Sequence, residues 1–203
     1  MPSALQVSEE EFYRDQDDDS PYQYLGGELV VREPASDVHE DLRDFLAAVV
    51  RIVFEERGSG VARSSRYPMR LDPKWSPEPD VMVVREERRH LIGPQRLEGA
   101  ADLVIEIASP GDVRRALRLK LPRYRKAGIP EIWVIDPYVQ SVRVEVLETS
   151  KRPNTAEAPI YRTFVVREGR LESAAFPGFW IDVSWLWQRP LPPALGCVRQ
   201  ILG

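Results

Sequence analysis

The sequence has few of the features that stabilise secreted proteins or anchor membrane proteins. Cys197 is the only cysteine among 203 residues, which excludes an internal disulfide and a metal cluster held by cysteines. The longest nearly apolar run, residues 46–54, contains Arg51 and is far shorter than the roughly 18 residues of a membrane span. Residues 1–20 lack the basic and then apolar pattern of a secretory leader. We therefore expect a cytoplasmic protein with no membrane partner.

The chain also lacks a net positive charge. The chain has 28 basic and 32 acidic residues, a net charge of −4, so no overall positive field attracts a polyanion. Any contact with nucleic acid must then be local. Only four basic residues are lysines, namely Lys74, Lys120, Lys126 and Lys151, and the others are arginines. Each lysine is therefore worth examining.

The length and the order of the expected elements indicate one α/β domain. At about 150 residues per domain, the chain fits a single domain over residues 1–203. We expect its core at about residues 22–148 and an antiparallel β extension, rich in aromatic residues, at about residues 159–190. The expected order of helix, strands, helix and strand is typical of a mixed β-sheet flanked by helices.

Apolar periodicity locates these elements. A long helix capped by Ser36 carries apolar residues three and four positions apart, at Val38, Leu42, Phe45, Leu46, Val49 and Val53. Residues 81–84 and 103–108 are apolar on both faces, as in central strands, and a helix follows to about Ala127. Residues 132–135 form the next strand. Residues 142–146 alternate in polarity, and we expect residues 161–166 to pair with them in antiparallel fashion.

Glu106 is the most informative residue of the sequence. Its strand is otherwise apolar on both faces, so its carboxylate must be paired, protonated or bound to a metal. An ion pair with one of the many arginines would explain it equally well. Asp80 begins another apolar strand, at the kind of sheet edge where open α/β sheets bind ligands. It could also simply be a turn residue.

Lys120 is the third candidate. The buried face of its helix is marked by Val113, Leu117, Leu121 and Tyr124, and Lys120 lies three residues after Leu117 and four before Tyr124. This spacing directs a lysine toward the sheet. In the alternative interpretation, the stem of the Lys120 side chain covers the core while its ammonium reaches water.

Two carboxylates and a lysine at one sheet edge have a chemical use. Carboxylate oxygens and water hold a hard cation such as Mg²⁺, which activates a water molecule and neutralises charge on a phosphoryl oxygen. A lysine can orient that water and stabilise the charged transition state. The three residues together indicate hydrolysis of a phosphodiester.

Several short motifs share a pattern with one known family. They are Gly27-Glu28-Leu29-Val30, His39, Pro79-Asp80-Val81, residues 102–107 with Ser109-Pro110, Lys120, Tyr124, residues 128–133 and Asp136-Pro137. With them the chain resembles, over roughly residues 22–185, the Uma-type family of bacterial restriction-endonuclease-like proteins in the PD-(D/E)XK nuclease superfamily. The resemblance implies a restriction-endonuclease-like fold.

The resemblance also implies roles for individual residues. Asp80 and Glu106 would be the carboxylates that bind Mg²⁺ or Mn²⁺. The lysine usually found two residues after the glutamate is replaced by Ala108, and this family supplies it from the following helix, which matches Lys120. Glu28 and His39 are auxiliary candidates, although a solvated strand end and a histidine on a helix surface would explain them as well.

Two functions follow as hypotheses. The first is a metal-dependent endonuclease that cleaves DNA, with Asp80, Glu106 and Lys120 as its catalytic residues. The second is a catalytically inactive nuclease-fold protein that acts as a binding or regulatory partner. The acidic net charge favours the second, as does Ala116 at a position where the family usually has Asp.

The C-terminal region raises the question of assembly. Five aromatic residues lie within twelve positions, at Phe176, Phe179, Trp180, Trp185 and Trp187. This is more aromatic area than one edge of the domain readily covers, so we expect an exposed patch and a homodimer, which would present two sites to a duplex. The alternative is that they close the core of their own domain.

Overall fold

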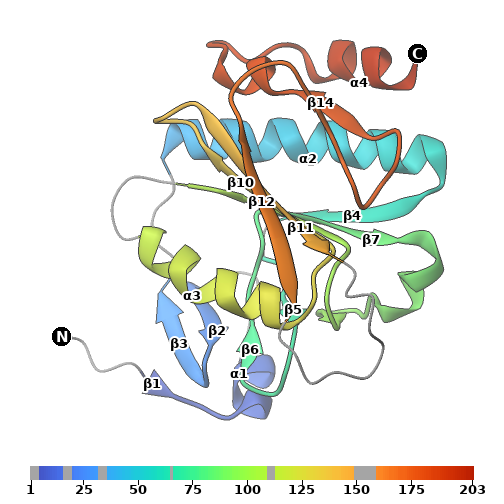
Figure 1. Ribbon diagram of the computed structural model, residues 1–203. Helices are drawn as coiled ribbons and strands as arrows, with labels where there is room; N and C mark the ends of the chain where they lie inside the picture. The colour runs from blue at the N-terminus through green and yellow to red at the C-terminus, as the bar shows by residue number, and fades with distance from the viewer. Residues whose placement is uncertain (1–4, 16–19, 32–35, 65, 109–112, 149–158) are drawn as a thin grey trace.

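The computed structural model describes residues 5–15, 20–31, 36–64, 66–108, 113–148 and 159–203, and its centre is a six-stranded mixed sheet (Figure 1). In spatial order the strands are β12 (Ile160–Val166), β11 (Ser141–Glu148), β10 (Glu131–Asp136), β9 (Leu103–Ile107), β7 (Val81–Arg85) and β4 (Gly60–Ser64). The pair β9–β10 is parallel and the other neighbours are antiparallel. The predicted mixed sheet and its antiparallel C-terminal strand are confirmed.

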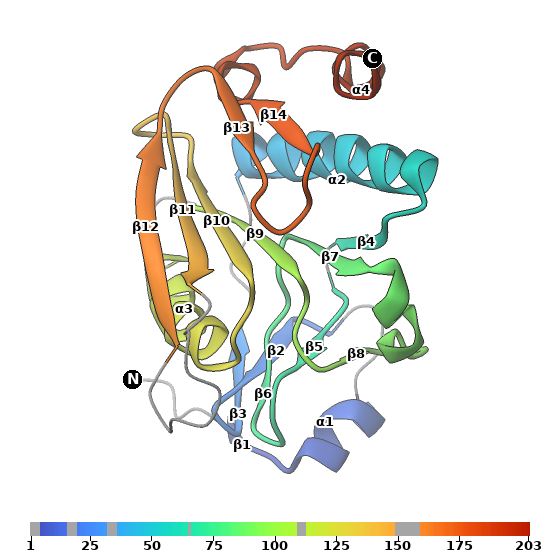
Figure 2. The ribbon, with the colours of Figure 1, turned by 45° about the vertical axis from the view of Figure 1, so that its right-hand side comes forward.

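Helices cover both faces of this sheet. Helix α2 (Asp37–Arg57) lies on one face, and α3 (Val113–Lys126) lies on the other (Figures 1 and 2). The Ser36 side chain accepts a hydrogen bond from the His39 backbone N–H, and Gly58 ends α2 at φ 59°. The predicted apolar stripe of α2 faces the sheet, with Leu42 and Leu46 fully buried. Within the described residues, no helix is long and apolar enough to cross a membrane.

A smaller antiparallel sheet lies below the main one in the view of Figure 1. Its strands, in spatial order, are β1 (Leu5–Gln6), β3 (Glu28–Val31), β2 (Tyr22–Leu25) and β6 (Trp75–Ser76). Helix α1 (Glu9–Asp15) contributes Phe12 and Tyr13 to an aromatic cluster with Tyr24. Strands β5 (Met69–Arg70) and β8 (Leu97–Glu98) form a short parallel pair, and the 3₁₀ helix η1 (Glu86–Leu91) follows β7. This sheet ends beside the start of β7, because β6 precedes β7 by only four residues.

The C-terminal elements complete the core on the α2 side. They are β13 (Arg170–Glu172), β14 (Trp180–Asp182), the 3₁₀ helix η2 (Val183–Trp187) and α4 (Ala194–Leu202). Phe176, Phe179 and Trp185 are buried, and Trp180 and Trp187 pack against the same cluster. The aromatic residues therefore close the core of their own chain, and they do not form the exposed patch that would indicate a dimer.

A buried carboxylate ties these C-terminal elements to the main sheet. Glu131, at the start of β10, is fully buried and accepts hydrogen bonds from Trp133 Nε1 at 2.7 Å, Ser173 Oγ at 2.5 Å and the Ala175 backbone N–H at 2.9 Å. These donors satisfy the carboxylate, so its burial is tolerated. The segment between β13 and β14 is thereby held against β10.

Candidate active site

Asp80 and Glu106 lie opposite each other at one end of β7 and β9, two neighbouring inner strands of the main sheet. In the antiparallel pair β7–β9, Val81 is opposite Ile105, and the same register one position further places Asp80 opposite Glu106. Directly opposite side chains in antiparallel strands project from the same face and are close neighbours. The Asp80 carboxylate is further fixed, because its Oδ2 accepts a hydrogen bond from the Ile107 backbone N–H at 2.7 Å. The two acids predicted from sequence are therefore brought together.

Helix α3 supplies two donors to Glu106. Lys120 Nζ lies 3.1 Å from both Glu106 Oε1 and Oε2, and the Tyr124 hydroxyl donates to Oε1 at 2.6 Å. Residues four apart lie on the same face of a helix, so one turn of α3 presents both groups to the strand below. Lys120 is only 5% exposed, which excludes the alternative in which its ammonium reaches water.

Lys120 has a third acceptor, the backbone carbonyl of Glu78 at 2.8 Å. An ammonium group has three N–H donors, and here they face this carbonyl and the two oxygens of Glu106. Glu78 itself is buried, and its backbone N–H donates to Gln23 Oε1 at 3.4 Å. The segment before β7 therefore helps to fix the position of the ammonium.

His39 approaches the site from the first turn of α2. Its Nε2 lies 3.3 Å from Asp80 Oδ1, and its Nδ1 lies 3.3 Å from Glu40 Oε1. Burial alone would lower the pKa of His39, but the hydrogen bond and charge of Asp80, helped by Glu40, raise it above its ordinary value. Compared with a free imidazole, His39 therefore keeps its second proton to a higher pH.

The pKa values of the two acids shift in opposite directions. Burial raises the pKa of Glu106 to about 7, against the lowering effect of Lys120 and with a further contribution from the Asp80 charge. Burial also acts to raise the pKa of Asp80, but the hydrogen bond and charge of His39, together with Lys120 and the Ile107 N–H, outweigh it and lower that pKa. Tyr124 is buried beside Glu106, so its pKa lies well above the usual value and its hydroxyl remains a donor. The site thus combines an ionised Asp80 with a Glu106 that titrates near neutrality.

The structure places only one of the two auxiliary candidates in contact with the site. His39 contacts Asp80, whereas Glu28 lies opposite Leu25 at the β2–β3 hairpin. Within the described part of the chain, no hydrogen bond or ion pair joins Glu28 to Asp80, Glu106 or Lys120. Its auxiliary role stays a prediction without a supporting contact.

Sequence reasoning overlooked the contribution of two residues. Tyr124 was placed on the buried face of its helix and among the motifs of the family but was given no role, although its spacing of four from Lys120 could have suggested a shared target. Glu78 was not singled out at all. No local signal identifies it, because Glu78 contacts Lys120 through its backbone carbonyl, a group that every residue carries.

The chemistry of the donors fits a hard divalent cation. Mg²⁺ is commonly bound through one or two carboxylates, with water as its remaining ligands. Asp80 and Glu106 supply two carboxylates, and the Asp80 side chain retains 18% exposure through which water can enter. Among the described residues, no group of three or more His, Cys, Asp or Glu side chains is arranged to hold a metal. Asp80 and Glu106 are therefore the candidate ligands of such a cation.

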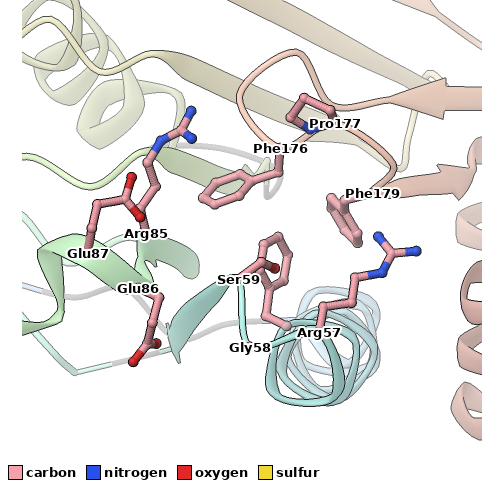
Figure 3. Close-up of a pocket in the computed structure, with 10 residues that line it drawn as sticks. Arg57, Gly58, Ser59, Arg85, Glu86, Glu87, Phe176, Pro177 and Phe179 are labelled. Carbon is pink, nitrogen blue, oxygen red and sulfur yellow. The ribbon is translucent and has the colours of Figure 1, made fainter.

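A separate cavity of about 290 Å³ lies at the other end of β7 (Figure 3). It is lined by side chains that include Phe54, Phe176 and Phe179, together with Arg57 and Arg85. The Arg57 guanidinium donates to the Ile201 carbonyl, and that of Arg85 donates to the Ala175 carbonyl. Both cations thus support the fold, and neither acid of the candidate site lines this cavity.

Comparisons with known proteins agree with this geometry. The sequence matches the family model Uma2, described as "Putative restriction endonuclease", over residues 9–184. The structure is similar to a protein from Anabaena variabilis ATCC 29413 described as "a putative nuclease belonging to DUF820". That match has a TM-score of 0.72 and 19% sequence identity, and it covers 89% of this chain and 97% of the other. The likeness concerns the fold, and a search of curated proteins found no match. Because the family model spans most of the chain and the whole cluster around Glu106, the chain belongs to the Uma2 family of restriction-endonuclease-like proteins.

Proposed function

We propose that this protein is a metal-dependent endonuclease that hydrolyses phosphodiester bonds of DNA. The observation that carries the proposal is the convergence of Asp80, Glu106 and Lys120, whose ammonium lies 3.1 Å from both Glu106 oxygens. A pair of acids and a lysine at one sheet edge is the arrangement expected of the PD-(D/E)XK nucleases. The restriction-endonuclease description of the family supports the same chemistry.

In this proposal Asp80 and Glu106 hold Mg²⁺ or Mn²⁺. When bound, the cation lowers the pKa of a water molecule and neutralises charge on the phosphoryl group. Asp80 suits the role, because His39 and the Ile107 N–H keep it a carboxylate and restrain both of its oxygens. His39 is then an auxiliary residue that acts through Asp80.

Lys120 is the proposed catalytic lysine. Its ammonium already bridges Glu106 and the Glu78 carbonyl, so it is positioned without a change in helix α3. It would donate a hydrogen bond to the attacking water or to a phosphoryl oxygen, where negative charge grows in the transition state. Such preorganised donors are effective because the surrounding protein excludes bulk water.

A second candidate is a nuclease-fold protein that binds or regulates a partner without cleavage. The specific observation in its favour is that the three donors of Lys120 all face protein acceptors. The net charge of −4 also opposes tight binding of a polyanion.

Cleavage assays separate the two candidates. Purified protein is incubated with supercoiled plasmid and with single-stranded DNA in Mg²⁺, in Mn²⁺ and in EDTA. We expect cleavage only with metal, and a loss of at least about 100-fold in Asp80→Asn, Glu106→Gln and Lys120→Met.

Two control variants match these changes outside the site. Asp102→Asn alters another buried acid, which pairs with Arg88 at 2.8 Å, and Lys126→Met alters an exposed lysine of the same helix. Both should retain cleavage. If the wild-type protein leaves both DNA forms intact in either metal, the nuclease proposal fails and the binding candidate is favoured.

We further propose that the protein acts as a homodimer in the cytoplasm. The support for the dimer is functional, because a two-fold dimer would present two sites to a duplex. Light scattering at micromolar concentration tests it: a mass near the 23.3 kDa of one chain contradicts the dimer, and a mass near twice that supports it. The support for the cytoplasm is that the sequence has a single cysteine, Cys197, whereas disulfides are common in oxidising compartments.

A further inference from the structure

The Tyr124 hydroxyl has a specific target in an otherwise apolar environment. The ring is fully buried and packs in the cluster that includes Leu121, Ile129 and Ile132. A phenylalanine would fill the same volume, so packing alone does not account for the oxygen. The hydroxyl instead donates to Glu106 Oε1 at 2.6 Å.

This bond makes the two oxygens of Glu106 unequal. Oε1 receives donors from both Tyr124 and Lys120, whereas Oε2 receives one from Lys120. Each carboxylate oxygen has about two lone-pair positions, so Oε1 is saturated and Oε2 keeps one position free. The register of β7 and β9 puts Asp80 next to this carboxylate.

The helix that carries Tyr124 is itself fixed. Arg125, the next residue, makes a bidentate ion pair with the fully buried Glu145 of β11, at 2.6 and 2.7 Å. The height of Tyr124 above β9 is therefore set by contacts outside the candidate site.

We propose that Tyr124 is a positioning residue, which holds Oε1 of Glu106 and thereby leaves Oε2 as the oxygen that binds the divalent cation together with Asp80. This inference rests on the proposed metal-dependent function. It assigns Tyr124 no contact with the cation or with DNA. The effect expected from its loss is therefore on metal affinity and not on the chemistry of the loaded enzyme.

The test compares Tyr124→Phe with Tyr161→Phe. Each variant loses one tyrosine hydroxyl that donates a hydrogen bond near α3, but Tyr161 bonds a backbone carbonyl outside the site. Mn²⁺ binding is measured by isothermal titration calorimetry on the wild type and on both variants at pH 8. Urea unfolding of each metal-free protein verifies that the folded chain is being titrated.

We expect Tyr124→Phe to raise the Kd for Mn²⁺ by about 10- to 100-fold, the usual effect of losing a group that orients a metal ligand, while Tyr161→Phe binds like the wild type. Saturating Mn²⁺ should restore cleavage by Tyr124→Phe to the wild-type rate, because Lys120 is unchanged. A merely structural role would lower the urea midpoint of both variants and leave both Kd values alike.

The outcomes separate this inference from the function on which it rests. If the wild type binds Mn²⁺ and Tyr124→Phe binds it equally well, the positioning role is overturned and the proposed function stands. If the wild type binds no Mn²⁺, the proposed function fails and the positioning role fails with it. If Tyr124→Phe does not fold, Tyr124→Met replaces it in the same titration, since a flexible apolar side chain fills the site without a hydroxyl.

Discussion

The position of Glu106 makes the stability of the metal-free protein depend on pH in a predictable direction. Burial raises the pKa of Glu106 to about 7, whereas the same carboxyl has its ordinary value of 4.5 in the unfolded chain. Between these values the folded protein binds more protons than the unfolded chain, so the free energy of unfolding falls as pH rises. This contribution is fully present below pH 4.5 and is lost as pH rises through about 7.

Glu106→Gln isolates this effect, because it keeps the shape of the side chain and removes its titration. For the two pKa values, linkage gives a loss of about 2 to 3 kcal/mol between about pH 5 and about pH 8. The assay is urea unfolding in EDTA, followed by tryptophan fluorescence, for both proteins across this range. His39 and Asp80 titrate in both proteins, so their contributions largely cancel in the difference between wild type and variant.

As pH rises, the wild type should therefore lose unfolding free energy relative to Glu106→Gln. A difference that stays constant from about pH 5 to about pH 8, within about 0.5 kcal/mol, would refute the assignment of a titration near neutrality to Glu106. Lys120→Met provides a second check. Because the ammonium lowers the pKa of Glu106, its removal should move the decline in stability to higher pH.

Three further predictions follow from the site and the core. Mn²⁺ should bind more tightly as pH rises from about 6 to about 8, since protons compete for Glu106, and calorimetric Kd values that do not change with pH would contradict this. Glu131→Leu leaves three buried donors without an acceptor and should lower the free energy of unfolding by about 3 kcal/mol in urea titrations. Gly60→Ala should destabilise by about 1 to 3 kcal/mol, because its Cβ would lie 2.8 Å from the Val84 carbonyl oxygen. Gly196→Ala is the matched control: its Cβ meets nothing within 4 Å in a helix, and it should stabilise the protein by up to about 1 kcal/mol.

Local sequence signals were sufficient to predict the helices and strands that carry the site. Ser36 and Gly58 mark the ends of α2 by capping, and the spacing of apolar residues identifies its buried face. The same reasoning directed Lys120 toward the sheet, because its position relative to Leu117 and Tyr124 is fixed by the geometry of one helix. The apolar runs around them placed Asp80 at the start of one strand and Glu106 within another.

The pairing of strands that are distant in the chain could not be predicted from the sequence. Nothing local to β7 or β9 specifies that Asp80 lies directly opposite Glu106, since register depends on contacts between distant segments. The two glycines before Glu28 predict a turn, but they do not say that the hairpin joins a separate sheet. The role of Tyr124 was hidden because its ring satisfies an apolar pattern whether or not its hydroxyl has a partner.

The C-terminal closure of the core also determines when the chain can fold during its synthesis. The face of the main sheet that contacts α2 is completed by Phe176, Phe179 and other residues after β12, which leave the ribosome after the main sheet and α2. Until then, the nascent chain presents Phe54 and Trp133 to water, and the Glu131 carboxylate lacks Ser173 and Ala175 as partners. Chains with uncovered apolar surface are prone to aggregate. Protein released early, with a stop after Val166, should therefore accumulate in inclusion bodies, and full-length translation should benefit from chaperones that shield this face.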